Sequence, residues 1–298
     1  FGYQPDRVAS QQFVATLPAR DLRTMAPGLF GREKSTVLLY RALNDAHLAH
    51  KGRPFKVGRQ GIGDCVSWGW KHGVDIHLAV MWKVGDSAEW REAATESIYG
   101  GSRVEAQGRS SGGWGDGSYG AAAAKWVRDW GVTFRKPYND FGFDLTTYSA
   151  DRAKQWGNYG NGGSGDAGKF DAEAKRHPVR NVALVKTFDE AAAAIASGYP
   201  VPVCSGQGFA STRDANGFAR AAGSWAHCMC FIGVRFDPDG LLCLNSWGPD
   251  WIDGPKWPVD AQGGSDMPDG SFWVARSTAE NMLRGADSFA VSGYEGFP

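Results

Sequence analysis

The sequence predicts an α+β fold, in which helices dominate the first half of the chain and short strands the second. Two observations support this prediction. Apolar residues recur at helical spacing over 65–84 and 121–130, whereas apolar runs of strand length, separated by turn residues, follow one another after residue 179. A chain of 298 residues can bury a substantial core and is long enough for two lobes. We therefore expect the helices and the strands to lie in separate lobes.

Composition divides the chain into four stretches. Residues 1–59 are a mixed lead-in that is expected to cross to the β lobe, and residues 60–148 are expected to form the helical lobe. Residues 149–178 are polar and glycine-rich, which favours an inserted loop or a linker between the lobes. Residues 179–298 are expected to form the β-rich lobe.

The individual elements are predicted from periodicity and from their stop signals. Gly131, for example, follows the second helical repeat in the position of a C-cap. The expected helices cover residues 35–49, 65–84, 88–99, 121–130 and 189–197. The expected strands cover residues 182–185, 201–205, 226–236, 240–245, 271–275 and 288–292.

The bulk composition excludes several classes of partner. Lys plus Arg and Asp plus Glu each total 32, so charge gives no reason to expect nucleic acid or an anionic membrane as a partner. No run approaches 18 apolar residues, so no membrane span is predicted. The five cysteines are an odd number, which leaves at least one unpaired unless the chain is cross-linked to another.

Cys65 follows a glycine-rich turn and opens the helix predicted for 65–84. Asp64 is expected to cap that helix, which places Cys65 in the first turn, where unpaired N–H groups and the helix dipole favour a thiolate. Gln60 can place an amide donor beside the sulfur, where an oxyanion would form during acyl transfer. The alternative interpretation is a buried cysteine at the tip of a core helix.

His227 lies on an apolar strand between cysteines. Side chains alternate along a strand, so Cys228 and Cys230 are expected to point away from the imidazole. The two cysteines also lack a second pair at the spacing of a zinc site. The sequence therefore predicts no metal ion here.

The strand after His227 turns back on itself and forms a predicted hairpin. Its return strand ends in Asn245-Ser-Trp-Gly248, which would bring Asn245 and Trp247 beside the histidine. An asparagine amide can hold an imidazole in one orientation, and an adjacent indole can shield that hydrogen bond from water.

The order of Gln60, Cys65, His227 and Asn245 resembles that of the papain-like cysteine peptidases, and the chain is identified as a divergent bacterial or phage-like member of that family. The Asn245–Gly248 block, followed by Trp251, is similar to the asparagine motif of the family. The similarity covers most of the chain. It includes residues 17–23, 115–117, 121–131, 137–138, 269–273 and 293–298.

The resemblance implies an active-site cleft between a helical lobe, which carries the nucleophile, and an antiparallel β-barrel-like lobe. It implies that Cys65 is the nucleophile, that His227 carries the proton and that Asn245 orients His227. It also implies that Gln60 and the Cys65 backbone N–H bind the oxyanion. The substrate would be a peptide or a protein, and no cofactor is implied.

The resemblance further implies a substrate-binding wall. Gly115, Asp116 and Gly117 correspond to the glycine pair of that wall, against which an extended substrate backbone could lie because glycines have no Cβ. Trp247 would cover the contact between His227 and Asn245 and would border the bound substrate.

The sequence departs from the family pattern at several points. Gln60 precedes Cys65 by five residues where the family usually has six, and Asp64 places a negative charge beside the thiol. The cysteines of the family's paired disulfides are mostly missing, which favours a reducing compartment or a virion-associated location over a lysosomal or secreted one. No inhibitory propeptide of the usual length precedes residue 17, so control is expected to come another way or the chain is already cleaved.

Two other functions fit the same motifs. The first is a papain-like fold used as a structural or binding component of a virion or surface assembly, with weak or no catalysis. It is motivated by the shortened turn after Gln60 and by the neighbouring Asp64. The second is cleavage of peptidoglycan cross-links, which narrows the peptidase hypothesis to one class of substrate.

Overall fold

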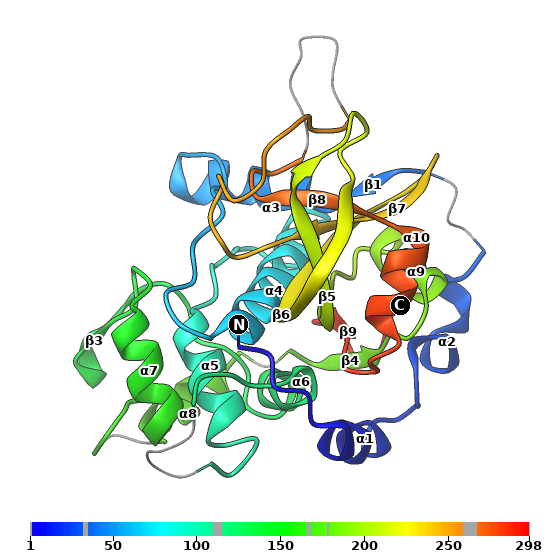
Figure 1. The fold of residues 1–298 in the computed structure, drawn as a ribbon. Helices are drawn as coiled ribbons and strands as arrows, with labels where there is room; N and C mark the ends of the chain where they lie inside the picture. Colours follow the sequence, from blue (N-terminus) through cyan, green and yellow to red (C-terminus); the bar gives the residue numbers. More distant parts are fainter. Residues whose placement is uncertain are drawn as a thin grey trace.

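The computed structural model describes residues 2–31, 35–109, 115–165, 168–177, 179–258 and 267–297. The α+β fold predicted from the sequence is confirmed, with a group of helices on one side of the molecule and an antiparallel sheet on the other (Figure 1). The principal helices are α1 (Arg7–Ala15), α2 (Leu22–Met25), α3 (Tyr40–Lys51), α4 (Cys65–Lys83), α5 (Thr95–Arg103), α6 (Gly120–Asp129), α7 (Ala150–Tyr159), α8 (Lys169–Ala174), α9 (Phe188–Ala196) and α10 (Arg276–Leu283).

A five-stranded sheet forms the core of the β lobe. Its path runs β1 (Val37–Leu38), β6 (Ala219–Phe236), β7 (Asp239–Leu244) and β8 (Ser271–Ala275), and β5 (Val201–Arg213) pairs with β6. Two shorter sheets pair β2 (Pro137–Tyr138) with β3 (Phe143–Asp144) and β4 (Asn181–Leu184) with β9 (Phe289–Ser292). Because β1 pairs with β6, the first part of the chain does reach the β lobe.

Helix α4 lies between the two groups of elements and contributes to both cores (Figure 1). Ile76 and Ala79 belong to the core that includes the sheet, whereas Val66 and Trp70 belong to the core that includes α6. A helix that is apolar around most of its surface is typical of a buried position. This helix therefore joins the two halves of the molecule.

Glycines allow α4 to approach the sheet closely. A Cβ atom on Gly69 would lie 2.8 Å from the Met229 carbonyl oxygen and 2.9 Å from Cys228 Sγ. A Cβ on Gly73, one turn later, would lie 2.8 Å from a ring carbon of Pro202. This close contact fixes the N-terminal half of α4, and with it Cys65, against β5 and β6.

Several predicted elements have different limits in the structure. The helix predicted for residues 35–49 begins at Tyr40, because Val37–Leu38 pair with β6 as strand β1. The helix predicted for residues 88–99 begins at Thr95, because Ala93 forms a bridge with Phe134 and its N–H donates to Asp75. The hairpin of β5 and β6 extends well beyond the predicted strand ends, as a ribbon that rises above the sheet (Figure 1). The small and polar side chains of this extension have no strand-like apolar pattern.

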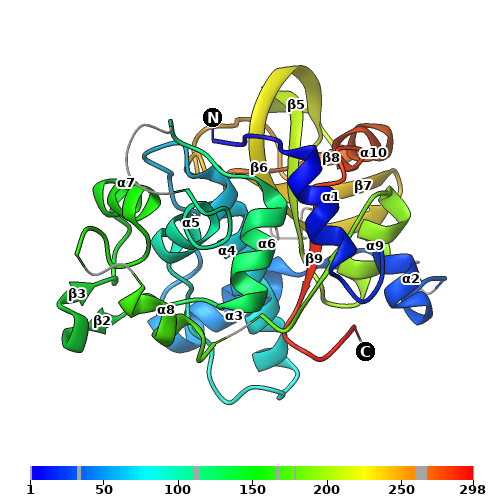
Figure 2. The ribbon, with the colours of Figure 1, turned by 90° about the horizontal axis from the view of Figure 1, so that it is seen from below.

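Residues 149–178 were expected to be an insertion or a linker, but the described part of this stretch contains α7 and α8. Helix α7 packs on α5, and a Cβ on Gly157 would lie 2.6 Å from the Tyr99 ring. Figure 2 shows α7 beside α5, and α8 on the same helical side of the molecule. The division of the chain into four stretches stays a prediction.

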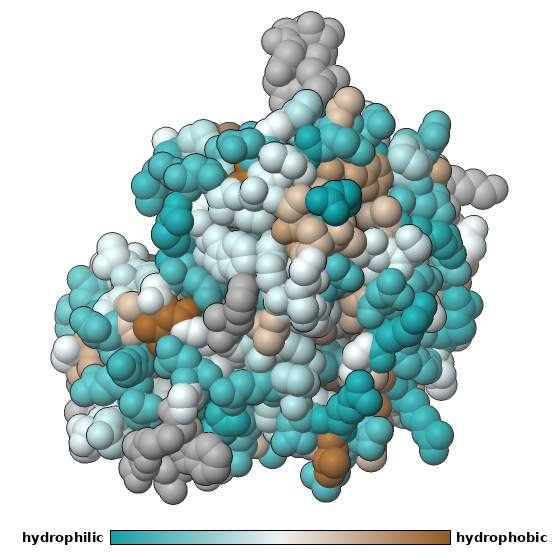
Figure 3. Space-filling model, in the orientation of Figure 1, coloured by the Kyte–Doolittle hydropathy of each residue, from teal (hydrophilic) through white to brown (hydrophobic). Residues whose placement is uncertain are grey.

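On the face of the molecule shown in Figure 1, hydrophilic side chains lie around the rim and less polar side chains occupy the centre (Figure 3). Within the described ranges, no helix is both long enough and apolar enough to cross a membrane.

Candidate active site

Cys65 is the first residue of α4 and is fully buried. Its sulfur lies against β6, where the backbone of Cys228, the residue after His227, hydrogen-bonds to it. The helix therefore presents the thiol to the backbone of the residue that follows the predicted histidine, although Cys65 and His227 are 162 positions apart in the sequence.

Burial raises the pKa of the Cys65 thiol to about 12, and the contacts from the Cys228 and Gly2 backbones act in the opposite direction. Burial lowers the pKa of His227 to about 4, although its hydrogen bond to Asn245 favours the charged ring. In this closed arrangement burial therefore acts against the expected thiolate, in the direction opposite to that of the helix N-terminus, and it favours the neutral imidazole.

His227 and Asn245 form the predicted pair. The imidazole Nε2 lies 2.7 Å from Asn245 Oδ1, which also accepts the backbone N–H of Ser246 at 2.7 Å. An amide oxygen can only accept, so Nε2 carries the proton and Nδ1 is the basic nitrogen of the neutral ring. The β6–β7 pairing creates this contact, because Cys230 pairs with Leu244, directly before Asn245.

Trp247 covers the histidine as expected. Its ring lies 4.6 Å from the His227 ring and is tilted by 31°. Trp225 and Trp251 extend the aromatic cluster, with ring centroids 4.6 and 5.3 Å from Trp247. Such a cluster excludes water from one side of the hydrogen bond between His227 and Asn245.

Gln60 is held firmly beside this pair. Its backbone N–H donates to Ser246 O at 2.8 Å, and its Oε1 accepts the Ser246 hydroxyl at 2.7 Å. Its Nε2 donates to Ile62 O at 2.9 Å, so the amide closes the shortened turn. Ser246, which was not among the predicted residues, orients this amide from the loop after Asn245.

Asp64 occupies the N-cap position of α4, but its side chain does not cap the helix. The carboxyl group instead accepts the Tyr148 hydroxyl at 2.8 Å, and the same hydroxyl accepts the Gly61 N–H at 3.1 Å. Burial raises the pKa of Asp64 to about 7, against the effect of the Tyr148 hydrogen bond. The prediction that the Asp64 side chain caps α4 is therefore wrong. Its carboxyl group instead binds the turn before α4 to the segment that contains Tyr148.

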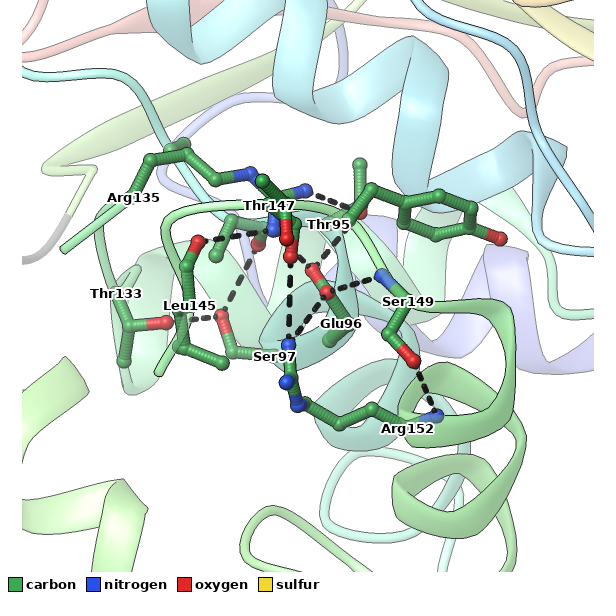
Figure 4. Close-up of polar contacts among 12 residues, drawn as sticks. Thr95, Glu96, Ser97, Thr133, Arg135, Leu145, Thr147, Ser149 and Arg152 are labelled. Atoms are coloured by element: carbon green, nitrogen blue, oxygen red, sulfur yellow. Dashed lines mark hydrogen bonds and ion pairs between the residues drawn. The ribbon is translucent and has the colours of Figure 1, made fainter. Parts of the chain in front are cut away.

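A buried ion-pair network holds the segment that carries Tyr148 (Figure 4). Glu96, on α5, is fully buried and accepts hydrogen bonds from Arg135 at 2.7 Å and from Arg152 at 3.3 Å. It also accepts the Ser149 N–H at 3.0 Å. Two guanidinium groups and a backbone donor offset the cost of burying this carboxylate, and they fix the loop next to Tyr148.

The predicted wall at Gly115, Asp116 and Gly117 is separated from β6 by residues 2–4, which bond to the wall segment and to Ala226. Arg103 holds it by donating to the carbonyl oxygens of Gly115 and Gly117, at 3.0 and 2.5 Å. Asp116 accepts the N–H of Gly63 at 3.1 Å, which ties the wall to the turn before Cys65. The wall belongs to a glycine-rich stretch, residues 108–120, of which residues 110–114 lie outside the described residues.

Residues 2–4 of the chain itself occupy the cleft. Gln4 N donates to Ser118 O at 2.8 Å, Ser118 N donates to Gly2 O at 2.8 Å, and Tyr3 N donates to Ala226 O at 3.2 Å. An extended segment is therefore paired with the wall on one side and with the residue before His227 on the other. No local pattern in the sequence indicates this contact.

Glycine is required at the point where this segment passes Cys65. A Cβ on Gly2 would lie 1.7 Å from Gly63 O, and a Cβ on Gly117 would lie 2.6 Å from Gly2 O. Gly117 also has a φ of 118°, which side chains rarely adopt. The two glycines thus let the segment reach the thiol.

Comparison with solved structures places the fold. The structure aligns over 98% of the chain with xylellain, a cysteine protease from Xylella fastidiosa, at a TM-score of 0.55 and 15% identity, covering 91% of that chain. Digestive procathepsin L 3 of Tenebrio molitor aligns with a TM-score of 0.53 and 14% identity, over 98% of this chain and 83% of that chain. Procathepsin B S9 from Trypanosoma congolense aligns with a TM-score of 0.55 and 10% identity, over 98% of this chain and 85% of that chain. No protein-family model and no curated protein matches the sequence. The predicted papain-like fold is confirmed.

Proposed function

We propose that the protein is a papain-like thiol hydrolase that cleaves peptide or isopeptide bonds through an acyl-enzyme on Cys65. The observation that carries this proposal is the arrangement of the thiol, the hydrogen-bonded His227–Asn245 pair and the Gln60 amide around one cleft. The papain-like fold of the chain supports it. An extended segment already lies in that cleft with its backbone paired to the wall, as a peptide substrate would have to lie.

The chemistry follows from the groups present. When Cys65 Sγ attacks the scissile carbonyl carbon, its proton passes to His227 Nδ1. His227 then protonates the leaving amine nitrogen as the C–N bond breaks, which leaves a thioester on Cys65. In the second half, His227 takes a proton from water, the oxygen attacks the thioester, and the C–S bond breaks as sulfur recovers its proton. Asn245 keeps Nε2 protonated throughout, so that Nδ1 does the proton transfer.

The oxyanion would form between two donors. The backbone N–H of Cys65 is among the unpaired donors at the N-terminus of α4, and Gln60 Nε2 carries a second N–H besides the one that bonds to Ile62. A donor of this kind typically contributes about 3 kcal/mol to the stability of the transition state. Ser246 holds the Gln60 amide, which compensates for the missing residue in the turn.

The cleft must open before a substrate can reach Cys65, because residues 2–4 cover the thiol and its exposed fraction is 0%. Any test of the proposal therefore needs a form in which this segment is displaced. The Gly2→Ala substitution should displace the segment, because the added Cβ cannot fit beside Gly63 O.

We expect the Gly2→Ala chain to hydrolyse a peptide library and to be labelled by an epoxysuccinate. The Gly2→Ala/Cys65→Ala chain should do neither. Labelling that persists without Cys65 would show that another residue is the nucleophile. Gly28→Ala serves as the matched control, because a Cβ at Gly28 meets no atom within 4 Å.

A structural or binding role is the second candidate, and the complete burial of Cys65 is the observation that favours it. If the Gly2→Ala chain binds peptides in the cleft but hydrolyses none and resists labelling, this candidate replaces the peptidase.

A further inference from the structure

Cys204 and Cys228 face each other across the hairpin of β5 and β6. The register of the two strands pairs Cys204 directly with Cys228, and their sulfur atoms lie 2.8 Å apart. Both residues are fully buried, in the same apolar cluster as Cys65. The contact is much closer than the one that Cys243 Sγ makes with the sulfur of Met229, at 3.7 Å. Two thiols are thus held together in an apolar environment.

The backbone at this pair suits a covalent bond between the two side chains. Directly opposed residues of an antiparallel ladder have Cα atoms about 4.5–5.5 Å apart, and their side chains lie on one face of the sheet. A disulfide joins Cα atoms that are about 4.4–6.8 Å apart. The Cys204 N–H donates to the Ser288 hydroxyl at 3.2 Å, as expected for a pair that exchanges no backbone hydrogen bonds and has the closer side chains. A bond between the sulfurs therefore needs no change of register.

All five cysteines lie within the described residues, and among them no other two are placed in this way. Cys230 pairs with Leu244, and Cys243 pairs with Phe231. Because side chains alternate along a strand, Cys230 and Cys243 point to opposite faces of the sheet. Cys65 belongs to α4, so no strand register holds it opposite another cysteine.

The pair lies where the regular part of the hairpin ends. Ser205 and His227 form the next pair, and the register shifts between Ser205 and Gln207. Beyond that point the two strands continue as the long ribbon that rises above the sheet (Figure 1). A bond between Cys204 and Cys228 would close the base of this ribbon and would hold the strand that carries His227 against β5.

Buried cysteines can also be simple packing residues, because a thiol behaves as a small apolar group. Packing accounts for Cys230 and Cys243, whose sulfurs contact a carbonyl oxygen and a thioether at 3.7 Å. It does not account for two thiols placed directly opposite each other at the last regular pair of a hairpin.

We propose that Cys204 and Cys228 form an intrachain disulfide that closes the base of the β5–β6 hairpin. The oxidant is a small disulfide, such as oxidised glutathione. One cysteine thiolate attacks it, so that a mixed disulfide forms and one glutathione leaves. The second cysteine sulfur then attacks the mixed disulfide, the bond between the two cysteines forms and the second glutathione leaves. The cysteines lose two electrons and two protons, which the two glutathione thiols carry away.

The bond should form while the chain folds. Burial raises the pKa of Cys204 well above its ordinary value, so the thiolate that disulfide exchange requires is scarce once the protein has closed around it. In a folding chain the two thiols are still in water when the hairpin first brings them together. The proposal does not depend on catalysis by Cys65.

Refolding of the reduced full chain in a buffer of reduced and oxidised glutathione tests the proposal. After an acid quench, two of the five cysteines should resist alkylation in denaturant. Peptide mapping without reductant should recover the two fragments that are linked through Cys204 and Cys228. Alkylation of all five cysteines, or a bond between any other two, would overturn the proposal.

The effect of a reductant on stability tests the assignment even where a variant is less stable than the wild type. The cysteines are 24 positions apart, and a bond across such a loop should lower the equilibrium constant of unfolding by roughly 100-fold. Reductant should abolish this gain in the wild type and in the matched control Cys230→Ala. The refolded Cys204→Ala and Cys228→Ala chains should not respond to reductant. A wild type that does not respond, or a Cys204→Ala chain that does, would make the pair mere packing residues.

Discussion

The carboxyl group of Asp64 lies one residue from the proposed nucleophile and is buried. Its folded-state pKa of about 7 lies above the value of 3.8 for the free side chain, because burial disfavours the charged form. The native state therefore binds a proton more tightly than the unfolded state. The stability that this proton confers is complete below about pH 4 and is lost as the pH rises through 7.

We predict that Asp64→Asn removes this part of the pH dependence. The free energy of unfolding of the wild type should fall between pH 4 and pH 7 by roughly 2–4 kcal/mol more than that of the variant, since one pKa unit corresponds to about 1.4 kcal/mol. Urea unfolding at a series of pH values measures the difference. Asp140→Asn, at an exposed carboxylate, should keep the wild-type slope.

The same carboxyl group should also affect the proposed reaction. A charged Asp64 beside Cys65 disfavours the thiolate, and its charge raises the pKa of the thiol. In the Gly2→Ala chain, Asp64→Asn should therefore extend alkylation of Cys65 to lower pH. An unchanged pH profile would mean that Tyr148 screens the thiol from this charge.

The site depends on the close contact between α4 and β6. A Cβ atom on Gly69 would lie only 2.8 Å from the Met229 carbonyl oxygen, so Gly69→Ala must displace backbone as well as side chains. Alanine improves helix propensity by about 1 kcal/mol, but a clash of this kind in a packed core usually costs 1–3 kcal/mol, about as much or more.

We therefore predict that Gly69→Ala lowers the free energy of unfolding and, in the Gly2→Ala chain, lowers the rate of Cys65 labelling by moving the thiol away from His227. Chemical denaturation and the kinetics of labelling measure the two effects. Gly28→Ala should change neither. A Gly69→Ala chain with unchanged labelling would show that α4 can shift without affecting the site.

At the scale of the whole molecule, α4 belongs to both cores, so the two lobes should unfold together. Trp70 is fully buried in the core of the helical lobe, and Trp70→Ala should lower the free energy of unfolding by about 3–5 kcal/mol. Loss of sheet and loss of helix, followed by circular dichroism at two wavelengths, should share one denaturation midpoint in wild type and variant. Two separate midpoints would show that the lobes are independent.

The sequence determined the features that depend on local pattern. The repeat that begins at Cys65 places apolar residues at helical spacing, which predicts a helix. Strand β8 has the predicted limits because its short apolar run follows the turn residues Asp269 and Gly270. The His227–Asn245 pair was also predictable, since a hairpin must bring its two strands together.

Tertiary structure decided the rest, because it depends on contacts between segments that carry no local signal. The side chain of Asp64 could have capped α4, but Tyr148, which is 84 residues away, binds it instead. The helix N-terminus predicted a thiolate, but residues 2–4 bury Cys65, and burial raises the pKa of its thiol. The sequence alone therefore determined the motifs that carry the proposed chemistry, and only the packing of distant segments decided which other groups surround them and whether solvent reaches them.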